Sequence, residues 1–209
     1  MARFIVAYRT KYLSELLAEA IILDMNKTTI LWLALLSTSI LAFAAQEQSV
    51  ARFEGETTLL RPEGYREWIF VGSSLGLAYS QDPEVTRGAN IYKNVYINPS
   101  SYREFARTGK FPEGTMMILE LFSSDVKREP GLQGSFEKDF ISLEMSVKDS
   151  VRFEGGWGYF NFSEGGVLKA KADANPPNLC FSCHDQNAAT DHVFTQFYPV
   201  LRDVAPKSN

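Results

Sequence analysis

Two cysteines and a histidine near the end of the chain have the spacing Cys-x-x-Cys-His. Cys180, Cys183 and His184 lie in residues 176–184, behind a pair of prolines. This spacing is the attachment signature of a c-type haem, because two thiols on one turn of chain can each add to one vinyl group at a haem edge. The adjacent imidazole is then placed to bind the iron. We predict one covalently attached haem c, with His184 as the metal ligand.

Two other kinds of site use closely spaced cysteines. A thioredoxin-like or disulfide pair follows a strand early in a βαβ unit, whereas this pair lies near the C-terminus. A structural zinc site needs four ligands, and the chain has only Cys180, Cys183, His184 and His192 as Cys or His residues. Their order fits no zinc finger or ribbon. Haem attachment would also use both cysteines and leave no unpaired thiol.

The beginning of the chain carries an export pattern. Residues 25–44 combine a short basic start, an apolar run and an Ala-x-Ala step, as in a secretory signal peptide. The run is shorter than the ~20 residues that a spanning helix needs, so we expect cleavage after Ala44 and no stable membrane anchor. Residues 1–24 are expected to be an upstream extension, with translation starting at Met25. We expect a periplasmic protein, which agrees with haem attachment on the exported side of the membrane.

The remaining residues, 45–209, suit one domain with its own core. The net charge of the whole chain is −4, and no cluster of Lys and Arg stands out, so nucleic-acid binding is not expected.

Strand patterns dominate this domain, with two helices among them. We expect strands at 91–97, 115–122, 140–147 and 157–162, and either a strand or a helix-to-strand entry at 65–71. Loops are expected at 73–90, 123–135 and 164–178. Asn98 as N-cap, Pro99 and Gly109 predict a helix between them. A closing helix is expected at 188–201, shortened or kinked by Pro199. This order predicts an α+β domain on a largely antiparallel sheet.

Several motifs, in order along nearly all of residues 45–209, resemble the cytochrome P-460 family, which includes the cytochromes c′-beta. The motifs are Tyr65-Arg66-Glu67-Trp68, 95–99 with Tyr102, Thr108-Gly109-x-Phe111-x-x-Gly114-Thr115, 146–150 with Arg152-Phe153, Cys180-x-x-Cys183-His184, and Val193-Phe194-Thr195-x-Phe197-Tyr198-Pro199-Val200-Leu201.

The resemblance implies a periplasmic mono-haem protein, usually a homodimer, with an antiparallel sheet packed on the haem. Cytochromes P-460 proper carry a lysine bonded to the haem macrocycle and oxidise hydroxylamine. That position corresponds to Leu119, which cannot form the bond, and Lys93 on the neighbouring strand is the alternative. The chain therefore looks more like the cytochromes c′-beta, whose five-coordinate haem binds nitric oxide and carbon monoxide behind a Phe-lined face.

Few side chains are expected to compete for the open side of the iron. Met117, Leu119, Phe122 and Phe140 are our candidates for the distal pocket, with Phe136 and Phe160 as further phenylalanines. His192 lies ~12 Å from His184 if both are on one helix. Met116, Met117 and Met145 could offer sulfur but are typical core residues. An apolar pocket of this kind favours neutral ligands over anions, which lose solvation there.

These observations predict an exported protein whose open haem iron binds or detoxifies nitric oxide or binds carbon monoxide, with weak peroxidase activity as a further expectation. One alternative is oxidation of hydroxylamine or nitric oxide, with Glu120 or Glu144 as base. Another is a simple electron carrier with a Met as sixth ligand. The expected partners are a small gaseous or nitrogenous ligand, a redox partner protein and a second copy of the chain.

Overall fold

The computed structural model describes residues 50–77 and 90–206. The expected extension at 1–24, the expected signal peptide at 25–44 and most of the expected loop at 73–90 lie outside these ranges. Within them, no helix has the length and hydropathy that crossing a membrane requires.

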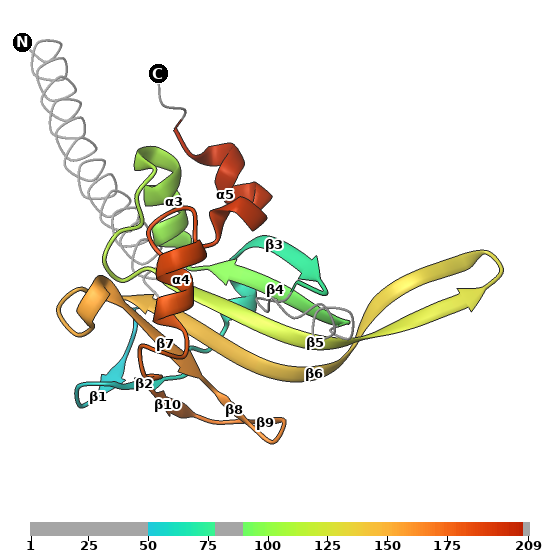
Figure 1. The fold of residues 1–209 in the computed structure, drawn as a ribbon, viewed down its shortest axis with the longest axis horizontal. Helices are drawn as coiled ribbons and strands as arrows, with labels where there is room; N and C mark the ends of the chain where they lie inside the picture. The colour runs from blue at the N-terminus through green and yellow to red at the C-terminus, as the bar shows by residue number, and fades with distance from the viewer. Residues whose placement is uncertain (1–49, 78–89, 207–209) are drawn as a thin grey trace, which may run out of the picture. The chain divides into compact units, whose positions relative to one another are not determined.

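A five-stranded antiparallel sheet, the main sheet, has the strand order β3-β4-β5-β6-β7 (Figure 1). Its strands are β3 (Ile69–Leu75), β4 (Ile91–Ile97), β5 (Met116–Glu129), β6 (Leu132–Lys148) and β7 (Trp157–Asn161). A short 3-10 turn, η1 (Tyr65–Glu67), precedes β3, and η2 (Glu154–Gly156) precedes β7. The predictions of an α+β fold and of a largely antiparallel sheet are confirmed.

The expected loop at 123–135 is wrong, because this segment is the far end of a β-hairpin. β5 and β6 stay paired as far as Glu129 and Leu132, and Pro130 and Gly131 make the turn. Figure 1 shows the hairpin projecting beyond the neighbouring strands. Most of its side chains are exposed on both faces, so its sequence lacks the alternation that marks a half-buried strand.

The two faces of the main sheet pack against different elements. One face meets a three-stranded sheet of β1 (Phe53–Glu54), β2 (Thr58–Leu60) and β10 (Lys171–Asp173), and this core includes Ile118, Leu143 and Met145. Because side chains alternate along a strand, Met117 and Leu119 lie on the other face.

The other face packs against α3 (Pro99–Thr108) and α5 (Pro199–Val204). We call the buried residues there the helix-side cluster: Val71, Val95, Ile97, Phe105, Phe111, Met117, Trp157, Tyr159, Val193 and Leu201.

The helix α3 begins and ends where its sequence signals predict. Pro99 is its first residue, and Gly109 follows its last with a left-handed φ of 72°. The Asn98 side chain does not cap the helix. Its Oδ1 accepts a hydrogen bond of 2.9 Å from the backbone N–H of Met116, which ties the start of α3 to the start of β5.

The expected helix at 188–201 is wrong. The chain forms α4 (Phe181–Asn187), then a tight turn from Thr190 to Val193, then η3 (Thr195–Phe197) and α5. Pro199 occupies the first turn of α5 and does not kink a longer helix. The expected loop at 164–178 is also wrong in part, because β9 (Val167–Leu168) pairs with β8 (Ser163–Glu164) and β10 joins the smaller sheet.

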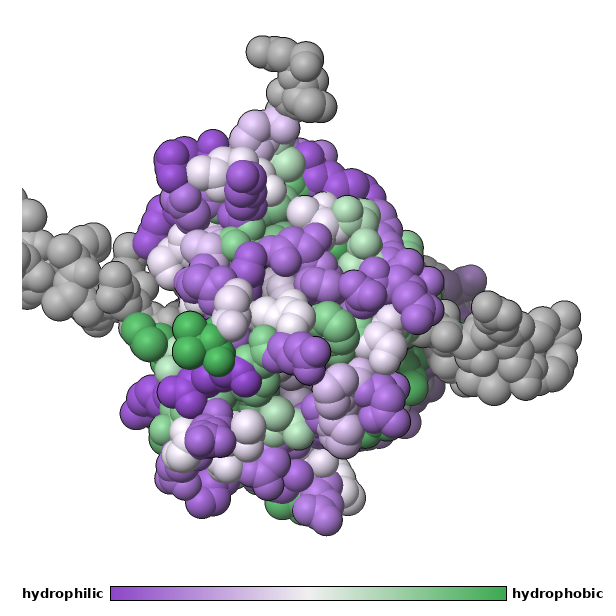
Figure 2. Space-filling view, turned by 60° about the vertical axis from the view of Figure 1, so that its left-hand side comes forward, coloured by the Kyte–Doolittle hydropathy of each residue, from purple (hydrophilic) through white to green (hydrophobic). Residues whose placement is uncertain are grey.

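The surface of the described part is mostly hydrophilic. Figure 2 shows one face on which hydrophobic residues form small groups among polar ones. The most exposed large hydrophobic residue is Val151, which is 98% exposed and lies on the turn before β7.

Candidate functional site

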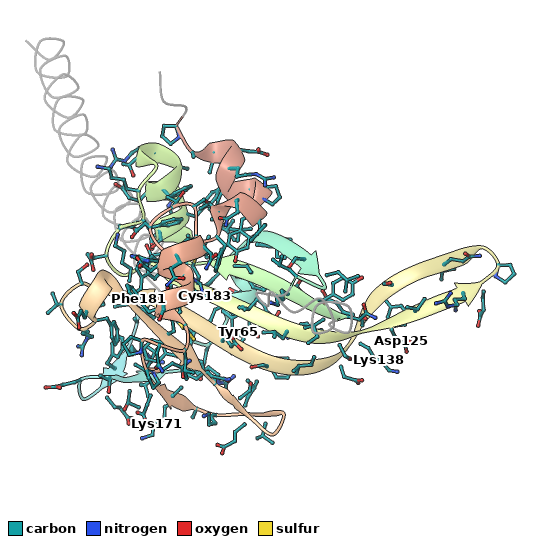
Figure 3. All side chains as sticks on the ribbon, in the orientation of Figure 1. Tyr65, Asp125, Lys138, Lys171, Phe181 and Cys183 are labelled. Atoms are coloured by element: carbon teal, nitrogen blue, oxygen red, sulfur yellow. The ribbon has the colours of Figure 1, made fainter. Side chains whose placement is uncertain are left out.

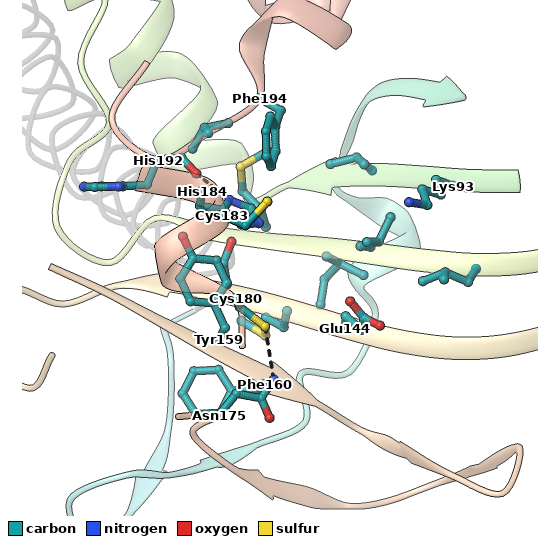
Figure 4. Close-up of a pocket in the computed structure, with 18 of the residues that line it drawn as sticks. Lys93, Glu144, Tyr159, Phe160, Asn175, Cys180, Cys183, His184, His192 and Phe194 are labelled. Carbon is teal, nitrogen blue, oxygen red and sulfur yellow. Dashed lines mark hydrogen bonds between the residues drawn. The ribbon is translucent and has the colours of Figure 1, made fainter. Parts of the chain in front are cut away.

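A pocket lies on the helix side of the main sheet. Its volume is about 440 Å³, within the roughly 300–1,000 Å³ of ligand and cofactor sites. The main sheet contributes Lys93, Val95, Met117, Leu119, Leu121, Glu144, Ser146 and Tyr159 to its lining. The helix α4 and the segment after it contribute Cys180, Cys183, His184, Phe194 and Tyr198 (Figure 4). Several of these residues also belong to the helix-side cluster, so the pocket is continuous with that core.

The helix α4 brings both cysteines and His184 to the pocket. Cys180 is its N-cap and Cys183 follows three residues later, a spacing that puts two side chains on one helix face. The two prolines before the helix provide carbonyl acceptors. Leu179 N–H, in the turn before the helix, donates to Pro176 (3.0 Å), and Ser182 N–H, in the first turn of the helix, donates to Pro177 (3.1 Å).

Both cysteines are free thiols. Burial raises the pKa of the Cys180 thiol, and a hydrogen bond from the Asn175 amide to Cys180 Sγ (3.5 Å) opposes that shift. The net effect keeps Cys180 protonated at neutral pH. Figure 4 shows the sulfur of Cys183 near His184 and the sulfur of Cys180 beside Asn175.

The imidazole of His184 is oriented by three neighbours. Its Nδ1 lies 2.7 Å from the carbonyl oxygen of His192, and its ring centroid lies 4.6 Å from that of Tyr159 and 4.5 Å from that of Phe194. A carbonyl can only accept, so Nδ1 carries the proton and Nε2 keeps its lone pair. Burial also lowers the pKa of His184, which favours the neutral ring. A neutral imidazole with Nε2 available is the form that binds a metal.

His192 is much closer to His184 than a continuous helix would allow, because the chain turns back between them. Its contribution is the backbone carbonyl. Its own ring packs against Phe181, with centroids 4.8 Å apart, and its Nδ1 lies 3.6 Å from a carboxylate oxygen of Asp185. Figure 4 shows this ring pointing away from the cysteines.

Two ionisable side chains, Lys93 and Glu144, line the same pocket. Burial raises the pKa of Glu144, and the charge of Lys93 opposes that shift. Burial lowers the pKa of Lys93, and the charge of Glu144 opposes that shift in turn. The pocket is therefore not uniformly apolar, and it contains a carboxyl group poised to exchange protons nearer neutral pH than an exposed glutamate.

Of the four distal-pocket candidates, Met117 and Leu119 line the pocket, whereas Phe122 and Phe140 are not among its lining residues. Phe122 lies opposite Tyr92 on β4, one position beyond the pair of Lys93 and Leu121, so alternation directs it to the other face. It packs edge-on against Phe140, with ring centroids 5.7 Å apart.

Strand alternation also decides which of the other phenylalanines and methionines considered as pocket residues face the pocket. Phe136 lies on the exposed hairpin at 47% exposure. Phe160 reaches the pocket lining but is packed mainly in the core between the sheets. Met116 and Met145 are also buried in that core, although Met145 contributes to the lining.

Glu120 lies apart from the pocket, on the opposite face of β5 from Leu119. It is 2% exposed and accepts hydrogen bonds from Tyr65 Oη and from Arg66, whose Nη2 is 2.7 Å away. Burial raises the pKa of Tyr65, which keeps its hydroxyl a donor. Of the two carboxylates considered as a base, only Glu144 faces the pocket.

Sequence reasoning did not identify Tyr159 and Phe194 as the neighbours of His184. Tyr159 follows Trp157 by two residues on β7, so strand alternation could have placed it on the same face. The contact of Phe194 depends on the turn at 190–193, which carries no glycine signal. The Tyr159 hydroxyl is buried and has no hydrogen-bond partner among the described residues, which leaves a donor at the pocket for a bound group.

Comparison with known proteins gives one result. A search of curated proteins found no match. The model of the family "Cytochrome P460" matches residues 62–195, which is well over half of the chain and includes the main sheet, both cysteines and His184. The chain belongs to the cytochrome P460 family, a classification that implies a haem cofactor.

Proposed function

We propose that this chain is a mono-haem c protein, with the haem held by Cys180 and Cys183 and its iron bound by His184. The observation that carries the proposal is that both thiols and an imidazole with its Nε2 lone pair available line one pocket. In each attachment, a thiol adds across a vinyl group: a carbon–sulfur bond forms, the S–H bond breaks, and its hydrogen goes to the other vinyl carbon. The step needs no oxidant.

The residues present fit such a group. Val95, Leu119 and Leu121 supply an apolar wall, the Tyr159 hydroxyl is a buried donor awaiting a partner, and His184 has its tautomer fixed. A haem held here would supply a redox-active iron, and His184 would leave one coordination position of that iron for another ligand.

We propose that this position stays open and takes a small neutral ligand such as nitric oxide or carbon monoxide. Two placements support this. Met116 and Met145 pack in the core between the two sheets, and the ring of His192 points away from the cysteines. Met117 belongs to the helix-side cluster and is 6% exposed, and Met145 reaches the pocket lining from the core between the sheets. Weak peroxidase activity would follow from an open iron. A sixth Met ligand would instead make the protein an electron carrier.

A second function, the oxidation of hydroxylamine, is favoured by Glu144. Oxidation of hydroxylamine releases protons, and the half-buried carboxylate of Glu144 on the pocket wall could accept one of them. The electrons would pass to a redox partner protein. The positive charge of Lys93 would offset the negative charge of Glu144 when the carboxyl group is ionised.

Three further proposals concern the cellular setting. We propose export to the periplasm through residues 25–44, which would place Ala45 at the mature N-terminus. We also propose a homodimer, on the family resemblance, and an external redox partner. Sequencing the N-terminus of the exported protein and measuring its mass in solution would test export and dimerisation. A mature chain that starts at Met1 would contradict export by this signal.

An absorption spectrum of the exported, full-length protein tests the proposed function. We expect haem to remain with the chain on a denaturing gel, and to be lost in the double variant Cys180→Ala/Cys183→Ala. A high-spin reduced band that shifts with carbon monoxide would support the open site. A low-spin reduced spectrum that does not change when carbon monoxide is added, and that becomes high-spin in Met117→Leu, would establish the electron carrier instead.

The same protein distinguishes the gas binder from the hydroxylamine oxidase. A haem peptide whose mass corresponds to attachment at Cys180 and Cys183 alone, with no turnover of hydroxylamine, supports the gas binder. Turnover that depends on Glu144 would support the oxidase. Lys93→Met serves as the matched control for a macrocycle bond through lysine, because it would change the haem peptide mass only if that bond exists.

A further inference from the structure

The turn that carries the carbonyl acceptor of His184 is held in an unfavourable conformation. Asp191 and His192 have φ angles of 46° and 59°, and among the described residues they are the two non-glycine residues with positive φ. The turn is closed by hydrogen bonds in both directions between Thr190 and Val193, of 2.8 and 3.3 Å. Tight turns with two left-handed residues usually use Asn-Gly or Asp-Gly. Here a bulky His takes the glycine position, so other contacts must hold the turn.

Asp191 supplies those contacts through both oxygens of its carboxylate. Lys148 Nζ lies 2.6 Å from Oδ2, and the indole N–H of Trp157 donates to Oδ1 at 3.2 Å. Lys148 also donates to the carbonyl of Phe111 at 2.9 Å, and Trp157 is 3% exposed. The turn is therefore anchored to the end of β6 and the start of β7, two rigid elements of the main sheet.

The next residue after Asp191 presents the carbonyl that accepts the Nδ1 proton of His184, 2.7 Å away. We propose that Asp191, held by Lys148 and Trp157, is a positioning residue that fixes this hydrogen bond and thereby sets how strongly His184 donates to iron. The inference rests on the proposed role of His184 as iron ligand. The hydrogen bond made by the second ring nitrogen tunes the basicity of a ligating histidine, so a looser turn makes His184 a weaker donor.

An ordinary ion pair elsewhere provides the comparison. Lys138 Nζ lies 2.8 Å from Asp125 on the exposed hairpin, and Figure 3 shows this pair well away from Cys183. It has nearly the same length as the pair of Lys148 and Asp191 but no connection to the pocket. Breaking it tests whether the loss of an ion pair far from the pocket changes the haem readouts, which a positioning role confined to Asp191 and Lys148 does not predict.

The test uses the full-length, haem-loaded protein and the variants Asp191→Ala, Asp191→Asn, Lys148→Met, Lys148→Arg and Asp125→Asn. The readouts are the iron–histidine stretching frequency of the reduced protein and its midpoint potential. In Asp191→Ala we expect the frequency to fall and the potential to rise, because a weaker donor stabilises ferric iron less. Lys148→Met should also lower the frequency and raise the potential. Lys148→Arg keeps the positive charge and should have the wild-type frequency and potential. Asp125→Asn should leave both unchanged.

The outcomes separate the two proposals. A wild-type protein with no covalently bound haem contradicts the proposed function, whatever Asp191 does. Haem-loaded Asp191→Ala with the frequency and potential of wild type contradicts the positioning role. If Asp191→Ala does not fold, Asp191→Asn decides: it keeps an acceptor for Trp157 but loses the charge facing Lys148, and unchanged values in it overturn the inference.

Discussion

Leu119 of β5 lies directly opposite Glu144 of β6, and both side chains line the pocket. On its other side, Leu119 faces Val95 of β4. Leu119 stands where the family resemblance expects the lysine of cytochromes P-460. The carboxyl group of Glu144 therefore has an aliphatic neighbour across the strand pair. Its positive counterpart is Lys93, which lies two residues from Val95 along β4.

The role of Glu144 as a base can be tested by replacing it with glutamine. If hydroxylamine is the substrate, Glu144→Gln should lower its oxidation rate about 100-fold or more, the lower range for general-base catalysis. Carbon monoxide affinity should change little, because a neutral ligand needs no base. Steady-state oxidation and carbon monoxide titration measure the two effects. Equal rates in wild type and variant would exclude Glu144 as the base.

The pH dependence of the same reaction follows from the pKa of Glu144. Burial raises that pKa, and the base must be ionised to accept a proton. The rate should therefore rise with pH, and the midpoint of this rise should lie above the ordinary pKa of a glutamate. Leu119→Lys would put a positive charge across from the carboxylate and lower its pKa, which moves the midpoint to lower pH. Leu119→Met is the uncharged control and should leave it in place. A rise that stays in Glu144→Gln must belong to another group.

The buried carboxylate on the other face should affect stability and not ligand binding. Glu120→Gln replaces a charged acceptor of Tyr65 and Arg66 by a neutral amide, and we expect a loss of about 1–3 kcal/mol in the free energy of unfolding. Glu104→Gln breaks the exposed pair with Arg107, and because solvent screens such a pair, the loss of stability should be clearly smaller. Denaturant unfolding of both variants gives the comparison. A similar loss in both would mean that burial of Glu120 adds nothing.

Gly155, on the turn before β7, leaves space for the first residue of α4. A Cβ at Gly155 would collide with the ring of Phe181, which lies between the two cysteines in sequence. Gly155→Ala should therefore displace α4 and reduce the fraction of chains with bound haem. Gly165 also has a positive φ, of 57°, but nothing lies within 4 Å of its Cβ position, so Gly165→Ala carries only the backbone strain. Equal haem content in the two variants would show that contact with Phe181 is unimportant.

The local signals of the sequence predicted the main elements well. Pro99 and Gly109 delimit α3 because proline geometry and the left-handed φ of a glycine act over a few residues. Asn98 precedes the helix as predicted, but its side chain binds Met116 and does not cap the helix. The alternation at 140–147 predicted β6 and separated Leu143 from Glu144. The alternation could not show what covers each face of the strand. The face with Glu144 is polar in sequence, like a solvent-exposed face, but in the structure it lines the pocket.

The failures involve contacts between distant parts of the chain. Phe122 and Phe140 were chosen by residue type, but strand register directs them to each other. The turn at Asp191 and His192 lacks glycine and is held by Lys148 and Trp157, which come from strands more than 30 residues earlier. No local pattern could have shown that the apolar residues at 193–201 belong to a returning chain and not to one long helix.

The shared membership of Val95, Met117, Tyr159 and Val193 in the pocket lining and the helix-side cluster has a thermodynamic consequence. The occupant of the pocket completes the packing that holds α3 and α5 on the main sheet, so its binding and the folding of the chain are linked equilibria. For a dissociable ligand, that stabilisation falls as the free ligand is diluted. An occupant bonded to Cys180 and Cys183 cannot be diluted away, so the folded state would keep its full contribution at any protein concentration.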